Sequence, residues 1–323
     1  MGVEFRNEGV KSNVLGKPMK EPQDVPFEKE GQYLKSDNRS NISYFLEHNV
    51  LLRRFTLSVG VLANYNSALN EGIHFYPGID ASYRIGDNFR LYGSWNRALR
   101  MPTFTDLYYE GKTNKGNPDL KPEESEAFEV GLKYNTYFLR AHIAGFYRKG
   151  KNMIDWVKEK PEDIWESQNL TKVDNLGFET NLSLLPRELG NKRFFIRKIE
   201  LGYAFIHQDK DSEGYISNYA LDYLKHKFTA QLSHSIWKGF SATWYVRWQD
   251  RAGSYTKYEN LKPAYEEPYA PYCLVDMKVN WEYQRLNLYA ELNNLLNSTY
   301  YDLGNIPQPG IWFKAGFRYS FKY

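Results

Sequence analysis

Residues 311–323 read IWFKAGFRYSFKY, and apolar side chains occupy every second position of this segment. The positions between them include three basic residues, Lys314, Arg318 and Lys322. Successive side chains of a β-strand point to opposite faces, so the segment predicts a strand with one apolar face and one charged face. Such a strand needs surroundings that are apolar on one side and wet on the other.

The same alternation recurs along the whole chain. In 240–249, Trp244 and Val246 share one face, whereas Tyr245 and Arg247 share the other. The pattern predicts about fourteen strands. They lie near residues 2–8, 38–51, 54–66, 73–85, 88–98, 124–135, 137–149, 173–185, 196–208, 222–236, 239–250, 271–283, 285–296 and 310–323.

Short and long connections alternate between these strands. Short turns are expected at 84–89, 133–138, 237–240 and 282–286. Long polar stretches are expected to be loops at about 9–37, 66–72, 98–123, 150–172, 209–221 and 251–269. This asymmetry between turns and loops is typical of outer-membrane barrels.

The length of the strands and their aromatic ends favour a membrane. Strands of about ten to thirteen residues exceed the ~5–6 of globular sheets and approach what a tilted strand needs to cross a bilayer. Tyr and Trp gather near strand ends, as at Trp95, Trp248 and Tyr319, and such rings favour the membrane–water interface. The sequence therefore predicts an all-β fold, an antiparallel transmembrane β-barrel.

A soluble protein with two β-sandwiches is the alternative fold. It would also alternate, but with shorter strands and more even loops. Polar residues occur at mid-strand in nearly every predicted strand, which a polar lumen explains directly. The net charge of +3 comes from scattered Lys and Arg and does not indicate a nucleic-acid partner. The single cysteine, Cys273, excludes an internal disulfide.

Residues 88–135 combine two predicted strands with a long loop that carries several short boxes. These are Arg-Ala-Leu-Arg-Met-Pro at 97–102, Asp-Leu-Tyr-Tyr at 106–109 and Gly-Asn-Pro-Asp-Leu-Lys-Pro-Glu at 116–123. In this order and spacing, the boxes resemble the barrel of TonB-dependent outer-membrane receptors. Further segments are similar to the same family, namely DNRSNISYFLEHNV at 37–50, NNLLNSTYYD at 293–302 and the final strand.

The resemblance implies energised import of a bulky, scarce nutrient, such as a ferric siderophore or cobalamin, across the bacterial outer membrane. Family members have an N-terminal plug domain inside a barrel of about 22 strands. We therefore expect residues 1–323 to be a single domain, the C-terminal part of such a barrel, without the plug. Haem-taking members place a His in the loop between the boxes, but no His lies between Met101 and Asp119.

The resemblance also implies partners. They are outer-membrane lipid, the N-terminal plug and the remaining barrel strands, the TonB complex acting through the plug, and the outer-membrane assembly machinery. An open sheet of this kind would expose unpaired backbone groups to lipid, which is unfavourable.

A passive porin-like or structural outer-membrane barrel is the alternative function, and a soluble β protein is a third. A plug encoded upstream would decide for the receptor.

The loop boxes have both a structural and a binding interpretation. Pro102, Asn117 and Pro118 are interpreted as loop-shaping residues, because proline ends strand pairing and Asn-Pro favours turns. Candidate substrate-binding residues in the loops and lumen are Arg97, Arg100, Tyr108, Tyr109, Trp165, Tyr255 and Tyr258. We expect Arg97, Arg140 and Arg247 to face the lumen, where they would attract anionic chelates. Alternatively, the loop rings pack on one another and the lumen charges pair with the plug.

Nothing in the sequence indicates catalysis. Ser233 and His234 are adjacent, so they point to opposite faces of a strand and cannot act as a nucleophile and base. The six His show no metal-ligand spacing, and no cofactor motif is present. We predict that the chain is not an enzyme and binds no cofactor or metal.

Phe321 and Tyr323 are expected to form the signal that the assembly machinery reads.

Overall fold

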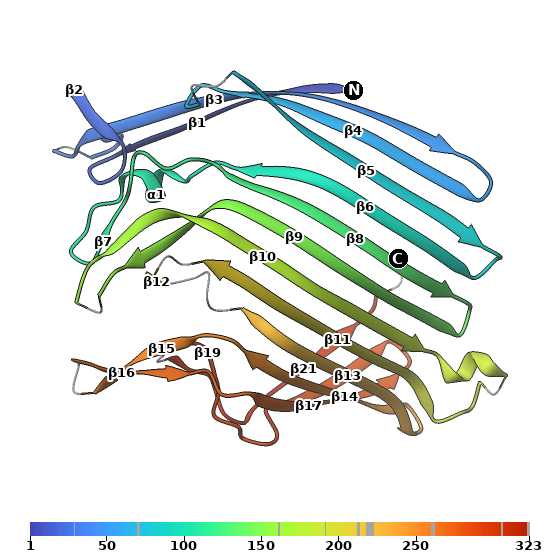
Figure 1. The fold of residues 1–323 in the computed structure, drawn as a ribbon. Helices are drawn as coiled ribbons and strands as arrows, with labels where there is room; N and C mark the ends of the chain where they lie inside the picture. Colours follow the sequence, from blue (N-terminus) through green and yellow to red (C-terminus); the bar gives the residue numbers. More distant parts are fainter. Residues whose placement is uncertain are drawn as a thin grey trace.

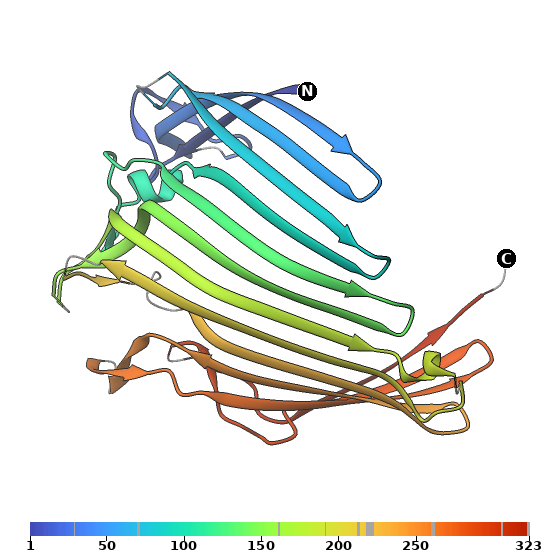
Figure 2. The same cartoon turned by 45° about the vertical axis from the view of Figure 1, so that its right-hand side comes forward.

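The computed structural model describes residues 1–28, 30–69, 72–160, 162–190, 192–211, 214–217, 223–259, 262–304 and 306–321. These residues form one large sheet that curves into an arc (Figures 1 and 2). The sheet has 17 strands. Two short pairs lie outside it, β15 (Ser254–Glu259) with β16 (Lys262–Pro268) and β19 (Tyr301–Leu303) with β20 (Ile306–Pro307).

Fourteen of the 17 strands form the wall of the arc, and each pairs antiparallel with the next. They are β1 (Gly2–Ser12), β3 (Gln32–Leu51), β4 (Phe55–Asn66), β5 (Ile73–Ile85), β6 (Phe89–Arg100), β8 (Glu123–Asn135), β9 (Leu139–Lys158), β10 (Trp165–Leu184), β11 (Ile196–Asp211), β13 (Leu224–Trp237), β14 (Phe240–Arg251), β17 (Tyr272–Tyr283), β18 (Leu286–Asn293) and β21 (Trp312–Tyr319). Each overlaps one predicted strand, so the prediction of about fourteen strands is confirmed.

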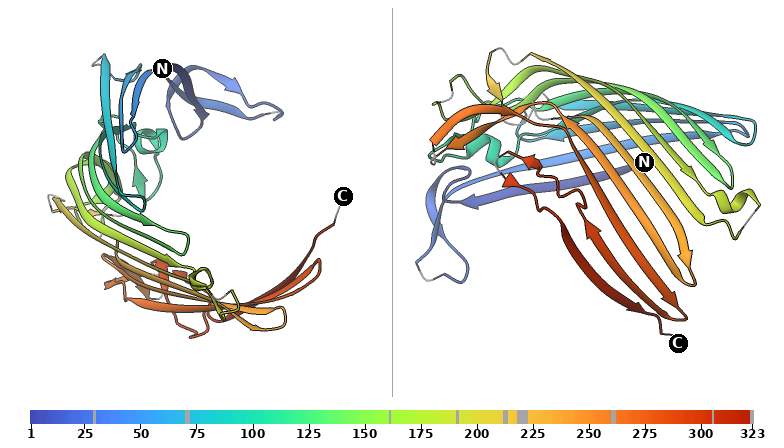
Figure 3. Two further views of the ribbon diagram at one scale, coloured as in Figure 1. Left: turned by 90° about the vertical axis from the view of Figure 1, so that its right-hand side faces the viewer. Right: turned by 90° about the horizontal axis from the view of Figure 1, so that it is seen from below.

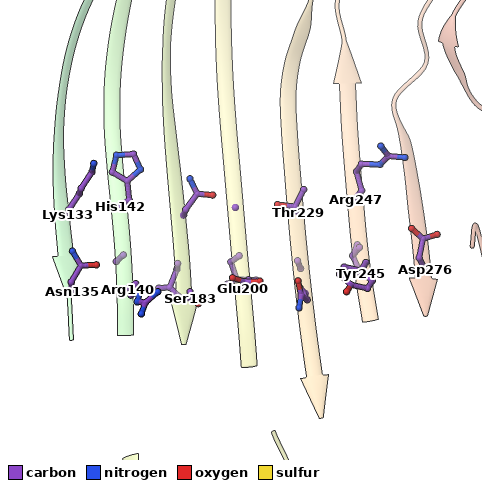
Figure 4. A pocket seen from close by; sticks show the side chains of 18 residues that line it. Lys133, Asn135, Arg140, His142, Ser183, Glu200, Thr229, Tyr245, Arg247 and Asp276 are labelled. Carbon is purple, nitrogen blue, oxygen red and sulfur yellow. The ribbon is translucent and has the colours of Figure 1, made fainter. Parts of the chain in front are cut away.

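The two faces of the wall differ as the alternation predicts. The convex face carries exposed apolar side chains, for example Phe128, Val130, Ile143 and Leu176. The concave face carries polar and charged side chains such as Arg140 (Figure 4). In the last strand, Phe313 and Phe317 are 65% and 74% exposed. Few apolar side chains of the described residues are buried, so the fold has no sandwich core.

The wall does not close on itself. Within the described residues, β1 pairs only with β3 and β21 pairs only with β18. Viewed end-on, the arc is open between its first and last strands (Figure 3). Both outer strands therefore present unpaired backbone N–H and C=O groups, which lipid cannot satisfy.

The connections sort to opposite ends of the sheet. Tight hairpins lie at one end, here called the turn end (right in Figure 1), and the longer connections with α1 (Phe104–Tyr108) lie at the other, the loop end. At the turn end, Lys238 and Gly239 both have positive φ, as a two-residue hairpin turn of type I′ requires. A longer connection at the turn end holds the short 3₁₀ helix η1 (Pro186–Leu189).

Three of the expected loops contain strands of six residues or more. The stretch 150–172 is largely the paired ends of β9 and β10, which are 20 residues long each. The stretch 9–37 contains β2 (Lys17–Asp24), and 251–269 contains β15 (Ser254–Glu259) and β16 (Lys262–Pro268). Polar composition alone does not break a ladder, because paired strands in water still satisfy one another's backbone groups. None of the described helices is long and apolar enough to span a membrane.

Candidate functional site

The connection between β6 and β8 folds back over the concave face. Its short helix α1 begins with a capping box, in which the Thr103 side chain accepts from the Asp106 amide and the Asp106 carboxylate accepts from the Thr103 amide. The reciprocal bonds satisfy two amides that would otherwise have no partner. In the end-on view, α1 lies inside the arc (Figure 3).

Hydrogen bonds connect the sequence boxes of this loop. The Asn117 amide donates to the Asp106 carbonyl at 2.9 Å, and the Asn117 side chain accepts from the Asp119 amide at 2.9 Å. The Pro102 carbonyl accepts from Arg39 Nη1 at 2.6 Å. Pro118 is exposed at the following turn. The loop-shaping role of Pro102, Asn117 and Pro118 stays a prediction.

Two residues of β3 hold the helical loop against the wall. Arg39 is 8% exposed, contacts Glu8 at 2.6 Å and lies over the Phe104 ring at 5.0 Å. The Tyr108 hydroxyl donates to Asp37 at 2.5 Å. Burial, and then the hydrogen bond that the Asp37 carboxylate accepts from the hydroxyl, raise the pKa of Tyr108 above its ordinary value. Tyr108 therefore stays neutral and acts as a hydrogen-bond donor.

The projecting ends of β9 and β10 pack beside this loop. β7 (Asn114–Lys115) pairs parallel with the start of β10, and Trp165 accordingly lies opposite Asn114. The Lys158 ammonium lies 4.5 Å from the centre of the Trp165 ring, and Tyr109 contacts Trp156 edge-on at 6.4 Å. Of the rings in this cluster, Tyr109 is the exposed one, at 38%.

A second group of rings surrounds the β15–β16 hairpin. Tyr255 contacts Tyr269 and Tyr301 at centroid distances of 5.1 and 5.6 Å. Lys257 Nζ lies 2.7 Å from Glu267, and this hydrogen bond lowers the pKa of the Glu267 carboxyl and raises the pKa of the Lys257 ammonium. Tyr258 is 54% exposed. Of the two predicted tyrosines here, Tyr255 is held in the cluster and Tyr258 is accessible.

The concave wall carries a separate hollow of about 680 Å³ near the turn end (Figure 4). Three cations line it, Lys133, Arg140 and Arg247. Two carboxylates also line it, but both have partners: Glu200 pairs with Lys198 at 2.8 Å, and Asp276 accepts from the Asn294 amide at 2.7 Å. Neutral hydrogen-bonding groups fill the space between the charges.

Comparison with known proteins identifies the family to which this architecture belongs. A profile of the family described as "TonB dependent receptor-like, beta-barrel" matches residues 1–295. The chain belongs to this family. The resemblance inferred from the loop boxes is confirmed, and so is the prediction that the chain is not an enzyme, because these proteins are receptors and transporters.

Individual relatives of this receptor barrel are distant. The vitamin B12 transporter BtuB of Vibrio vulnificus is 26% identical over 225 residues, which cover 52% of this chain and 36% of that protein. The ferrienterobactin receptor of Escherichia coli is 22% identical over 297 residues, 83% of this chain and 38% of that protein. The ferric enterobactin receptor PfeA of Pseudomonas aeruginosa, in a mutant form with enterobactin, matches with a TM-score of 0.73 at 19% identity, covering 99% of this chain and 51% of that one. The chain thus spans about a third to a half of the length of these relatives.

The predicted site residues of the receptor barrel divide into separate groups. Tyr108, Tyr109 and Trp165 lie around the α1 loop, and Tyr255 and Tyr258 lie on the β15–β16 hairpin. Arg100 is not free for a ligand, because its guanidinium binds Glu123, with Nη2 at 2.7 Å from Oε1. Phe321 is 78% exposed, whereas Tyr323 lies outside the described residues.

The expectation that Arg97 faces the lumen is wrong. In the uninterrupted register of β6 with β8, Arg97 shares the convex face with Leu91 and Trp95, and it pairs with Glu124 at 3.6 Å. Arg100 is an odd number of residues away and therefore lies on the opposite face. Arg140 and Arg247 do line the concave hollow, as expected.

Sequence reasoning missed Lys133 and the anchors Asp37 and Arg39. The alternation in 124–135 marked Lys133 as a polar-face residue, but only the strand order shows that it lies beside Arg140. Within the described residues, no group of three or more His, Cys, Asp or Glu side chains is arranged to hold a metal ion.

Proposed function

We propose that this chain is the C-terminal part of the barrel of an outer-membrane receptor that imports a bulky, scarce nutrient with energy from TonB. The observation that carries the proposal is the wall itself. Its convex face is apolar along the strands and its concave face is charged, and the family to which the chain belongs builds receptors from such walls. We place the convex face against the hydrocarbon of the bacterial outer membrane.

The open edges lead us to propose partners within the same receptor. The free edges of β1 and β21 need further strands before the wall can lie in lipid. We assign those strands, and a plug that contacts TonB, to parts of the receptor outside residues 1–323. In this arrangement, residues 1–323 act as one barrel domain that the outer-membrane assembly machinery inserts.

For the substrate we propose a ferric siderophore or a cobalamin-like molecule. The names of the relatives support these two substrate classes, because they include a vitamin B12 transporter and ferric enterobactin receptors. The rings of Tyr109 and Tyr258 at the loop end are the candidate first contacts, because both are exposed and Tyr109 is held edge-on against Trp156. Four further predicted residues would support this surface from beneath, because each is held by a hydrogen bond or a ring contact: Tyr108, Trp165, Tyr255 and Arg100.

The proposal is tested by uptake in cells. The complete reading frame that contains this chain is expressed in an Escherichia coli strain without its own catecholate and cobalamin receptors, with and without TonB. We expect TonB-dependent accumulation of iron from ferric enterobactin or of labelled cyanocobalamin. Entry that is equal without TonB and rises linearly with solute concentration would instead identify a passive porin-like barrel.

A further inference from the structure

Two neighbouring connections at the turn end carry exposed apolar side chains together with basic ones. They are residues 185–195 between β10 and β11, and residues 235–240 around the turn between β13 and β14. Leu189, Phe195, Ile236 and Trp237 are each more than half exposed. The two segments also hold four basic residues and one acidic residue, so their net charge is positive. We call these two segments the turn-end patch.

Hydrogen bonds hold the two connections side by side. The Ser235 amide donates to the Phe195 carbonyl at 2.7 Å, and Arg187 Nη2 donates to Ser235 Oγ at 2.7 Å. Arg187 Nε also donates to the Phe194 carbonyl at 2.8 Å. Residues that are 40 or more positions apart in the sequence therefore form one surface.

The hairpin side of the patch continues the convex face of the wall. In the unbroken register of β14 with β17, Phe240 is seven residues from Arg247 of the concave hollow, so Phe240 lies on the convex face. Trp237 pairs with Phe240, and the Phe240 ring contacts that of Trp281 at 6.0 Å. Tyr283 in turn stacks on Trp281 at 5.9 Å. The apolar face thus ends here in a row of rings, an arrangement that suits the boundary between hydrocarbon and headgroups.

Lys192 and Lys238 are the two lysines of the patch. Lys238 Nζ lies 5.1 Å from the centre of the Trp237 ring, and Lys192 is exposed on the other connection. Within the described residues, no carboxylate lies within 4.0 Å of either ammonium group. Lysines at the edge of a lipid-facing surface extend toward the phosphate level of a bilayer, where an anionic leaflet attracts each of them.

We propose that the turn-end patch binds the headgroups of anionic phospholipids in the leaflet at the turn end of the wall. The inference rests on the proposed placement of the convex face in lipid and adds the chemical class of lipid at one edge. The lysines match an anionic phosphodiester, and the exposed apolar side chains continue the lipid-facing surface. A zwitterionic headgroup carries its own cationic group, which the lysines would repel.

The experiment measures the lipid that the purified protein retains. The protein from its complete reading frame is mixed, in a neutral detergent, with equal amounts of phosphatidylglycerol and phosphatidylcholine, and the lipids that stay bound through gel filtration are quantified. A parallel sample contains soluble polyglutamate instead of lipid. The variant K192Q/K238Q is compared with K149Q/K151Q, which removes two lysines from the loop end of the convex face. Those two lysines lie opposite Glu126 and Glu124, so their charge is balanced locally.

We expect the wild type and K149Q/K151Q to retain phosphatidylglycerol in preference to phosphatidylcholine. In K192Q/K238Q this preference should fall by about fivefold for each lysine removed, and added salt should weaken it in the wild type. Trp237→Gln should lower the retention of both lipids and leave their ratio unchanged, because the ring contacts lipid regardless of headgroup charge. Heat-modifiable gel mobility verifies that each variant is folded.

Equal retention of the two lipids by the wild type would overturn the proposal, and so would the same loss of preference in both lysine variants. Retention of polyglutamate by the wild type but not by K192Q/K238Q, without a preference for phosphatidylglycerol, would identify an acidic polypeptide as the occupant instead. The proposed function is judged separately by uptake. TonB-dependent import without a lipid preference removes the lipid site and leaves the function, and a lipid preference without such import does the reverse.

Discussion

Arg100 and Glu123 join the two ends of the loop between β6 and β8. Arg100 Nη2 donates to Glu123 Oε1 at 2.7 Å, and the same oxygen accepts from the Ile154 amide of β9 at 2.8 Å. Glu123 is 7% exposed, so its carboxylate has little water as an alternative partner. One carboxylate thus connects the end of β6, the start of β8 and the projecting part of β9.

We predict that Glu123→Ala destabilises the loop end by about 1–3 kcal/mol, because the substitution leaves the Arg100 guanidinium and the Ile154 amide without their acceptor. The measurement is thermal unfolding of the complete protein together with protease cleavage within 101–122. Glu166→Ala is the matched control, since its pair with Lys115 spans 3.7 Å between half-exposed side chains and should contribute little. Equal effects of the two substitutions would contradict the prediction.

Ile143 tests which face meets the lipid. It is 51% exposed on the convex face, whereas its neighbour His142 lies on the concave face. Ile143→Arg should destabilise the inserted protein by about 2–4 kcal/mol if the position lies near the bilayer midplane. His142→Arg, one residue away, should be tolerated because it stays in a wet lumen. Folding of each variant in lipid vesicles is followed by heat-modifiable gel mobility. A larger loss of folding for His142→Arg than for Ile143→Arg would show that lipid contacts the concave face instead.

The Lys257–Glu267 pair predicts a pH window for the β15–β16 hairpin. The hydrogen bond to Lys257 depresses the pKa of Glu267, so its stabilisation is present above the ordinary value of 4.5 and disappears as pH falls through the lowered pKa. The pKa of Lys257 is raised by the same bond, so its contribution is full below 10.5 and disappears as pH rises through the raised pKa.

Hydrogen exchange of 254–268, corrected for the intrinsic rate, should therefore be slowest between these limits. Glu267→Gln should remove the acid limb of the profile while leaving the exchange of the wall strands unchanged. A hairpin equally protected at pH 3 and pH 7 in the wild type would refute the assignment.

The last strand predicts an assembly phenotype. Replacing Phe321 and Tyr323 with Ser in the complete protein should lower its level in outer membranes, because the terminal aromatic residues are the expected signal for insertion. Phe321 is 78% exposed and lies just beyond the end of β21. Substituting Ser320 with Thr provides a control at the neighbouring position. Unchanged membrane levels of the double variant would rule the signal out.

The local pattern was sufficient for the strands but not for their full length. Period-two alternation predicted every wall strand, because a residue's face depends only on its parity within the strand. It failed at β9 and β10, whose polar ends continue as a ladder past the apolar band. Hydrophobicity reports contact with lipid, whereas the ladder continues wherever two backbones stay paired.

The sequence by itself determined the class of fold, the strand order along the chain and the family, since alternation and the boxes at 97–123 are local properties. Only the tertiary structure decided which charges meet. Lys133, which is distant in sequence from Arg90, lies directly opposite it, and Arg97, which was predicted to face the lumen, pairs with Glu124 on the convex face. The reason is that parity within a strand sets the face of a side chain, whereas the register between strands, which no single segment encodes, sets its neighbours.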